Sequence, residues 1–148
     1  MAYGAPMSSR QEKRLLEKAA PLLRPDEQVE LIALGKLGTI AGAIKKSFGR
    51  NVAVGILTAG TVVPYAAQKE LYIVLTSQNL HFFSAHLAMA GDHAFSIPRS
   101  LAAVTEPTGK LIVKYELHIQ GTDERFALSF PRPTNKQGQA LADRLPRT

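Results

Sequence analysis

The sequence predicts a mainly β protein of the α+β class. We expect a bent antiparallel barrel of six or seven strands, with a helix before it, a capping helix after it and an apolar helical insertion after the first strand. Apolar and polar residues alternate along most of the second half, and turn residues interrupt that half at short intervals. The 148 residues, 45% of them hydrophobic, suffice for a single domain over 1–148 with its own core.

The first helix is expected over residues 8–24. Ser9 and Glu12 have the spacing of a capping box, in which hydroxyl and carboxylate each accept a hydrogen bond from a backbone amide of the first turn. Pro21 predicts an end or a kink near Ala20, because proline has no amide hydrogen to donate. The apolar residues of this segment recur at three- and four-residue steps and form one stripe: Leu15, Leu16, Ala19, Leu22 and Leu23.

The strands are expected from their period of two. They are Val29–Leu34 and then, within the antiparallel region 70–130, Leu71–Leu75, Leu80–Phe83, Phe95–Pro98 with Leu101–Thr105, Leu111–Gln120 and Arg125–Phe130. A loop is expected over His86–Asp92. In the Leu111–Gln120 strand, the alternation predicts one buried face: Leu111, Val113, Tyr115, Leu117 and Ile119. The last helix is expected over 134–145, capped by Thr134 or Asn135.

Two strings of this chain resemble bacterial pleckstrin-homology-like domains and the GRAM-type branch of that superfamily. Tyr72–Phe83 is similar to the family's hairpin of valine, leucine and threonine, a polar turn, a leucine and two aromatics. Ala94–Val104 is similar to its strand with isoleucine and proline followed by an apolar residue and a valine. The resemblance covers about Pro25–Leu34 and Glu70–Leu145, and it implies a fold. Residues 35–69 have no counterpart in the family pattern.

The basic charge of the protein is local. The chain has 18 Lys and Arg against 12 Asp and Glu, which gives a net charge of +6. Residues 31–69 hold five of the basic residues and no acidic one, and their neighbours are apolar. This combination favours contact with an anionic membrane over nucleic acid, because nucleic-acid binders interleave their charge with polar or aromatic contacts.

Catalytic and metal-binding signatures are not found. The chain has no cysteine, which excludes disulfides, thiolate zinc sites and thiol nucleophiles, and it contains no phosphate-binding loop or hydrolase motif. The four histidines match no metal-ligand spacing and are interpreted as surface or strand-edge residues: His81, His86, His93 and His118. Asp123 and Glu124 are interpreted as turn residues. No enzyme activity, cofactor or metal is expected.

The insertion, residues 35–69, is the candidate contact surface. Lys45, Lys46 and Arg50 lie beside one apolar helical face, which consists of Leu37, Ile40, Ala41, Ile44 and Phe48. The uncharged run Val52–Ala67 has 16 residues and is shorter than the roughly 20 that a spanning helix needs, so a helical hairpin is expected.

Three interpretations of the insertion remain open. It packs on the barrel of its own chain, it contacts anionic lipid or a membrane-associated protein, or it joins copies into a homo-oligomer through small faces such as Gly38 with Gly42. For the lipid or protein contact, the expected residues are Ile44, Lys45, Lys46, Phe48 and Arg50. The alternative function is that of a scaffolding protein that self-assembles and has no small ligand.

The expected location is cytoplasmic, with peripheral contact at the inner face of the membrane. Met1–Ser9 carries no charged residue, and the charged run Arg10–Lys18 occupies the place where an export signal would have its apolar core.

Overall fold

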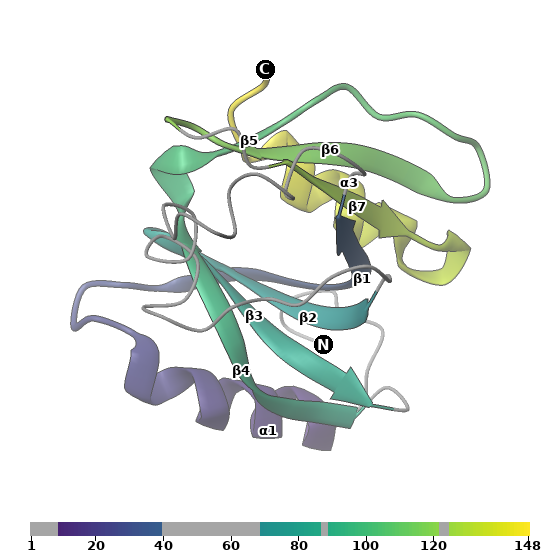
Figure 1. The fold of residues 1–148 in the computed structure, drawn as a ribbon. Helices are drawn as coiled ribbons and strands as arrows, with labels where there is room; N and C mark the ends of the chain where they lie inside the picture. The colour runs from purple at the N-terminus through teal and green to yellow at the C-terminus, as the bar shows by residue number, and fades with distance from the viewer. Residues whose placement is uncertain (1–8, 40–68, 87–88, 122–124) are drawn as a thin grey trace.

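The computed structural model of the chain describes residues 9–39, 69–86, 89–121 and 125–148 (Figure 1). Its helices and short 3₁₀ turns are α1 (Ser9–Ala19), η1 (Ala20–Leu22), η3 (Arg99–Leu101), η4 (Arg132–Thr134) and α3 (Asn135–Asp143). Its strands are β1 (Val29–Thr39), β2 (Lys69–Thr76), β3 (Asn79–His86), β4 (Met89–Pro98), β5 (Ala102–Val104), β6 (Val113–Ile119) and β7 (Arg125–Phe130). The predicted mainly β fold with a helix at each end is confirmed.

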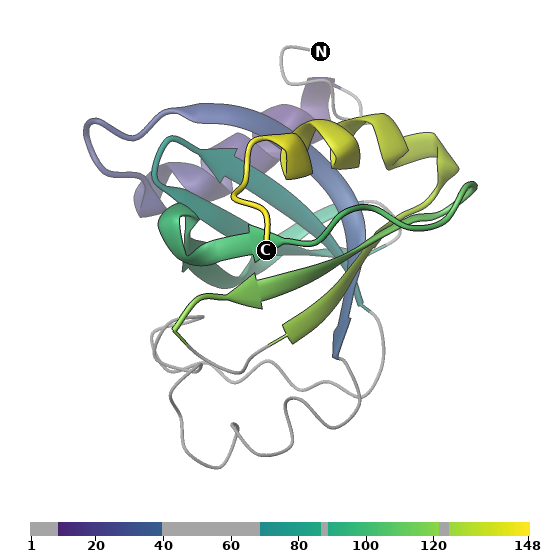
Figure 2. The same ribbon diagram turned by 90° about the horizontal axis from the view of Figure 1, so that it is seen from above.

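One sheet contains all seven described strands, in the order β4-β3-β2-β1-β7-β6-β5, and every neighbouring pair is antiparallel. Strand β1 joins the two halves. Its residues 29–37 pair with β2, and its residues 36–39 pair with β7. The sheet bends so that its halves face each other, and α3 lies over the opening between them (Figure 2).

The main core lies between the two halves of the sheet. The alternation predicted for β6 is observed, since Val113, Tyr115, Leu117 and Ile119 are all buried there. Leu141, Ala142 and Leu145 reach the same core from α3 and the residues after it. Helix α3 therefore completes the barrel by burying its apolar side.

A second apolar cluster lies on the outer face of the β1–β4 half. Helix α1 covers that face (Figure 1). The buried members of the cluster come from the helix and from all four strands: Leu15, Ala19, Ile32, Tyr72, Val74, Phe83 and Ala90. This half of the sheet is thus buried on both faces, which explains why Leu71–Leu75 is a continuous apolar run instead of an alternating one.

The first strand is longer than predicted. It continues beyond Leu34 to Thr39, so Leu37 is a buried strand residue, 3% exposed, and does not begin a helical face of an insertion. Gly38 pairs with Ala127 of β7 in the same strand. A Cβ atom at Gly35 would lie 2.6 Å from the Phe130 ring, so the glycine lets β1 and that ring approach closely.

Two further boundaries differ from the prediction. The loop expected over His86–Asp92 is wrong, because β4 begins at Met89 and Ala90 is buried beneath α1. Strand β6 begins at Val113, and Leu111, expected on the buried face, is 66% exposed. The break at Pro21 is confirmed, since α1 gives way to a 3₁₀ turn at Ala20.

The last helix, expected over 134–145, extends from Asn135 to Asp143. Thr134 precedes it but makes no capping hydrogen bond with its side chain. Its hydroxyl instead donates to the carbonyl of Pro131 at 3.3 Å.

Candidate functional site

The five predicted contact residues, Ile44, Lys45, Lys46, Phe48 and Arg50, lie outside the described residues. The strands on either side of them are described. Leu37 of β1 pairs with Lys69 of β2, so the chain leaves the sheet and re-enters it at one end of the β1–β2 pair. Thr39 pairs with Phe126 near the start of β7, which brings the β7 strand to the same end.

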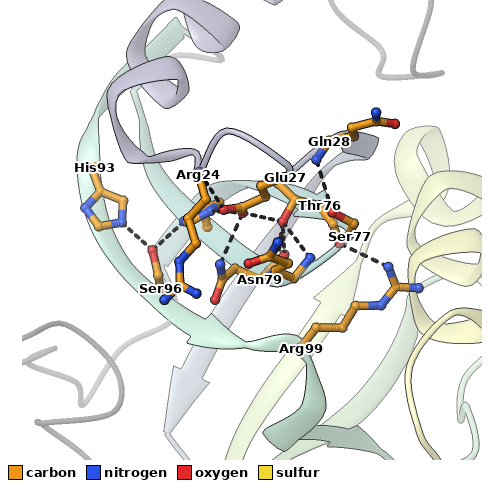
Figure 3. A network of polar contacts seen from close by, with 11 residues as sticks. Arg24, Glu27, Gln28, Thr76, Ser77, Asn79, His93, Ser96 and Arg99 are labelled. Carbon is orange, nitrogen blue, oxygen red and sulfur yellow. Dashed lines mark hydrogen bonds and ion pairs between the residues drawn. The ribbon is translucent and has the colours of Figure 1, made fainter.

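A polar network lies on the outer face of the sheet, between the η1–β1 loop and strands β2–β4 (Figure 3). At its centre is Glu27, whose side chain is fully buried. The carboxylate accepts hydrogen bonds from the Thr76 hydroxyl, the Asn79 amide at 3.1 Å, His81 Nε2 at 2.8 Å and the backbone amide of Arg24 at 3.1 Å. Four donors thus converge on one carboxylate.

This environment keeps Glu27 ionised. Burial alone would raise the pKa of its carboxyl group, because it penalises the charged form. The hydrogen bonds from Thr76, His81, Asn79 and the Arg24 amide together outweigh burial and lower the pKa to about 2, from an ordinary value of 4.5. The η1–β1 loop is therefore held to the β2–β3 hairpin by a buried anion.

The network continues from Glu27 toward the surface. His81 is 3% exposed, and its Nδ1 lies 2.6 Å from the Ser96 hydroxyl. His93 Nε2 lies 2.8 Å from the same hydroxyl. Burial, followed by the nearby His81, lowers the pKa of His93, while a hydrogen bond with the backbone of Phe95 opposes the shift.

The order of carboxylate, imidazole and hydroxyl is one that enzymes use to activate a serine. Here the Ser96 hydroxyl contacts two imidazoles, and it has one hydrogen to donate. One imidazole must therefore donate its own N–H to Ser96. These hydrogen bonds form a structural link between β3, β4 and the η1–β1 loop.

The sequence interpretation of His81 as a surface or strand-edge residue is wrong. His81 lies next to Phe82 of the main core and so on the opposite face of β3, and that face is covered by α1 and by the η1–β1 loop. Pro25 and Glu27 stand in a string typical of a turn, which gives no sign that Glu27 is buried. The signal that would have found both is the continuous apolar run Leu71–Leu75, which requires a cover on each face.

The remaining histidines and acidic candidates are not brought together. His93 is an exposed residue of β4, and His118 on β6 is 3.9 Å from Glu116. Asp92 pairs with Lys18 of α1 at 3.3 Å. The side chain of His86, together with Asp123 and Glu124, lies outside the described residues. Within the part of the chain that the structure describes, no three His, Asp or Glu side chains are grouped to hold a metal ion.

An open groove of about 450 Å³ lies at the opposite end of the β1–β2 pair from residues 40–68. It is lined by Ser77, Gln78, Arg99, Ser100 and Pro146. These residues come from the β2–β3 turn, the η3 turn and the C-terminal residues. Arg99 also contacts the Thr76 carbonyl and Glu30, each at 3.0 Å, so the groove adjoins the buried network (Figure 3).

Among the described residues, no helix has the length and apolar character needed to span a membrane.

Comparison with known proteins gives one structural match. No protein-family model matches the sequence, and no curated protein matches it. Among solved structures, the chain is similar to the crystal structure of a pleckstrin homology domain from Shewanella amazonensis SB2B, with a TM-score of 0.48 and 17% sequence identity. The match covers 89% of this chain and 95% of that chain. The resemblance predicted from the sequence and this match name the same kind of domain. This match gives no indication of what the chain binds.

Proposed function

We propose that the protein is a non-enzymatic binding module that contacts an anionic membrane surface through the segment between β1 and β2. The observation that carries this proposal is the charge distribution. Residues 31–69 contain five basic residues and no acidic one, in a protein whose remaining charge nearly cancels. An apolar segment with this charge has the composition of a surface-binding element.

The strand register supports the same proposal. Residues 35–39 and residue 69 belong to β1 and β2, so the contact segment is limited to 40–68. Both of its ends are joined to the sheet at one end of the strand pair, where Leu37 faces Lys69.

The proposed contact residues have two roles. Lys45, Lys46 and Arg50 supply attraction to lipid headgroups, at about 1 kcal/mol each near a charged surface, and Ile44 and Phe48 enter the apolar boundary. Together the three charges contribute about 3 kcal/mol. This makes the binding reversible and dependent on salt.

Vesicle sedimentation tests the proposal. The protein should sediment with vesicles that contain phosphatidylserine and stay in solution with neutral phosphatidylcholine vesicles. Changing Lys45, Lys46 and Arg50 together to Gln should lower the affinity for phosphatidylserine vesicles about 100-fold, which corresponds to the loss of about 3 kcal/mol of binding free energy. Changing Lys110, Lys114 and Lys136 to Gln removes the same charge elsewhere and should have a much smaller effect. Equal sedimentation with both kinds of vesicle, or with neither, would rule the proposal out.

A further inference from the structure

The groove formed by Ser77, Gln78, Arg99, Ser100 and Pro146 has a cation with unused donors in its wall. A guanidinium group has five N–H donors in a fixed plane. Arg99 Nη1 donates to the Thr76 carbonyl at 3.0 Å and forms an ion pair with Glu30 Oε2 at 3.0 Å. Arg99 Nη2 donates to the Arg144 carbonyl at 3.2 Å.

These hydrogen bonds use two of the five donors. Among the described residues, the N–H of Nε and one N–H of each Nη have no hydrogen-bond acceptor. Nε and Nη2 lie side by side along one edge of the guanidinium plane. Their spacing matches two oxygens of one carboxylate or phosphate group, which is the arrangement that distinguishes arginine from lysine in anion recognition.

The surroundings fix Arg99 before any ligand arrives. Its side chain is 24% exposed and is tied at once to the end of β2, to β1 and to the end of α3. Little side-chain entropy is then left to lose on binding. Nearby, the Ser77 hydroxyl accepts from the Gln28 amide at 3.1 Å and keeps its own hydrogen to donate, and Ser100 is exposed.

We propose that this groove is a binding site for a carboxylate or phosphate group, held by the Nε and Nη2 edge of Arg99 and by the hydroxyls of Ser77 and Ser100. The site lies at the end of the β1–β2 pair opposite the Leu37–Lys69 pair, beyond which residues 40–68 leave and rejoin the sheet. Glu30 limits its strength, because the carboxylate neutralises part of the Arg99 charge and repels an incoming anion.

Nuclear magnetic resonance titration of the ¹⁵N-labelled protein tests the site. Sodium acetate and sodium phosphate are added in separate experiments, with sodium chloride at matched ionic strength as the control. We expect saturable shifts at the amides of Ser77, Gln78 and Ser100 and at Arg99 Nε–H, with acetate, with phosphate or with both. The anion whose shifts saturate shows whether the site takes a carboxylate or a phosphate group. Equal shifts with chloride would overturn the proposal.

Two variants sharpen the test. Glu30→Gln keeps Arg99 intact and removes the repelling charge, so it should tighten binding about five-fold, an effect typical of one half-exposed charge. Glu116→Gln makes the same charge change on β6 and should leave the dissociation constant unaltered. Arg99→Lys keeps the charge but loses the paired donors, and it should weaken binding at least ten-fold. If Glu30→Gln and Glu116→Gln change the dissociation constant equally, or if Glu30→Gln leaves it unchanged, Arg99 does not bind the anion.

Discussion

Glu27 illustrates how a buried charge is tolerated at the level of one residue. An isolated buried carboxylate would take up a proton, because burial penalises its charged form. The side chains of Thr76, Asn79 and His81 and the amide of Arg24 each donate to it instead. The cost of burial is thereby offset by contacts that exist only when the η1–β1 loop is seated on the sheet.

Glu27→Gln should therefore destabilise the fold more than a surface change does. The amide that replaces one oxygen brings donors to a site already filled with donors, and it loses the charge that strengthens each bond. We expect the free energy of unfolding, measured by urea denaturation at pH 7, to fall by about 2–4 kcal/mol. Glu116→Gln, which alters a half-exposed carboxylate on β6, is the matched control and should change it by less than about 0.5 kcal/mol. Similar losses in both variants would mean that the network does not stabilise the fold.

The stability of the protein should depend on Glu27 in acid. Its folded pKa of about 2 lies below the ordinary value of 4.5, so the folded state binds its proton less readily than the unfolded state does. The contribution is complete above pH 4.5 and is lost as pH falls from 4.5 toward 2. Its size is about 3 kcal/mol. Urea denaturation between pH 7 and 2 should show that the difference in unfolding free energy between the native protein and Glu27→Gln becomes smaller as the pH falls. A difference that stays constant would contradict a folded pKa of about 2 for Glu27.

At the scale of elements, the sequence predicts the strand residues that face the main core. It does not predict the second buried layer on the outer face of the sheet. A period of two reveals only one buried face, and for β6 this was sufficient. For Leu71–Leu75 both faces are buried, because α1 covers the outer one. His81 lies on this covered face and Glu27 in the η1–β1 loop seated on it, and in the sequence only the continuous apolar run Leu71–Leu75 indicates that the face is covered.

Helix α3 is docked through a glycine. A Cβ atom at Gly138 would lie 2.2 Å from the Phe130 ring, so the helix approaches β7 more closely than alanine permits. Gly138→Ala should destabilise the protein by about 1–3 kcal/mol in thermal or urea denaturation, because overpacking exceeds the roughly 1 kcal/mol that alanine gains in a helix. Gln139→Ala, at an exposed position of α3, should be neutral or slightly stabilising. A gain in stability at Gly138 would show that the helix docks less tightly.

At the scale of the whole molecule, the two ends of the β1–β2 pair differ. Residues 40–68 join the sheet at one end, and the Arg99 groove lies at the other end of the pair, which is about eight strand residues or roughly 25 Å long. The sequence located the basic segment from charge alone, but it placed its start at residue 35, inside what is β1. The groove was not predicted, because its residues come from three segments that only the fold brings together.

Replacing residues 40–68 by a short Gly-Ser turn, with β1 and β2 kept whole, tests the central claim most directly. The variant should retain the circular dichroism spectrum of the barrel and lose sedimentation with phosphatidylserine vesicles, and light scattering should give the same mass as for the native protein. If the folded variant still sediments with these vesicles, the membrane contact lies elsewhere. If an assembly of the native protein instead becomes monomeric, the segment joins copies of the chain, and the proposed function is wrong.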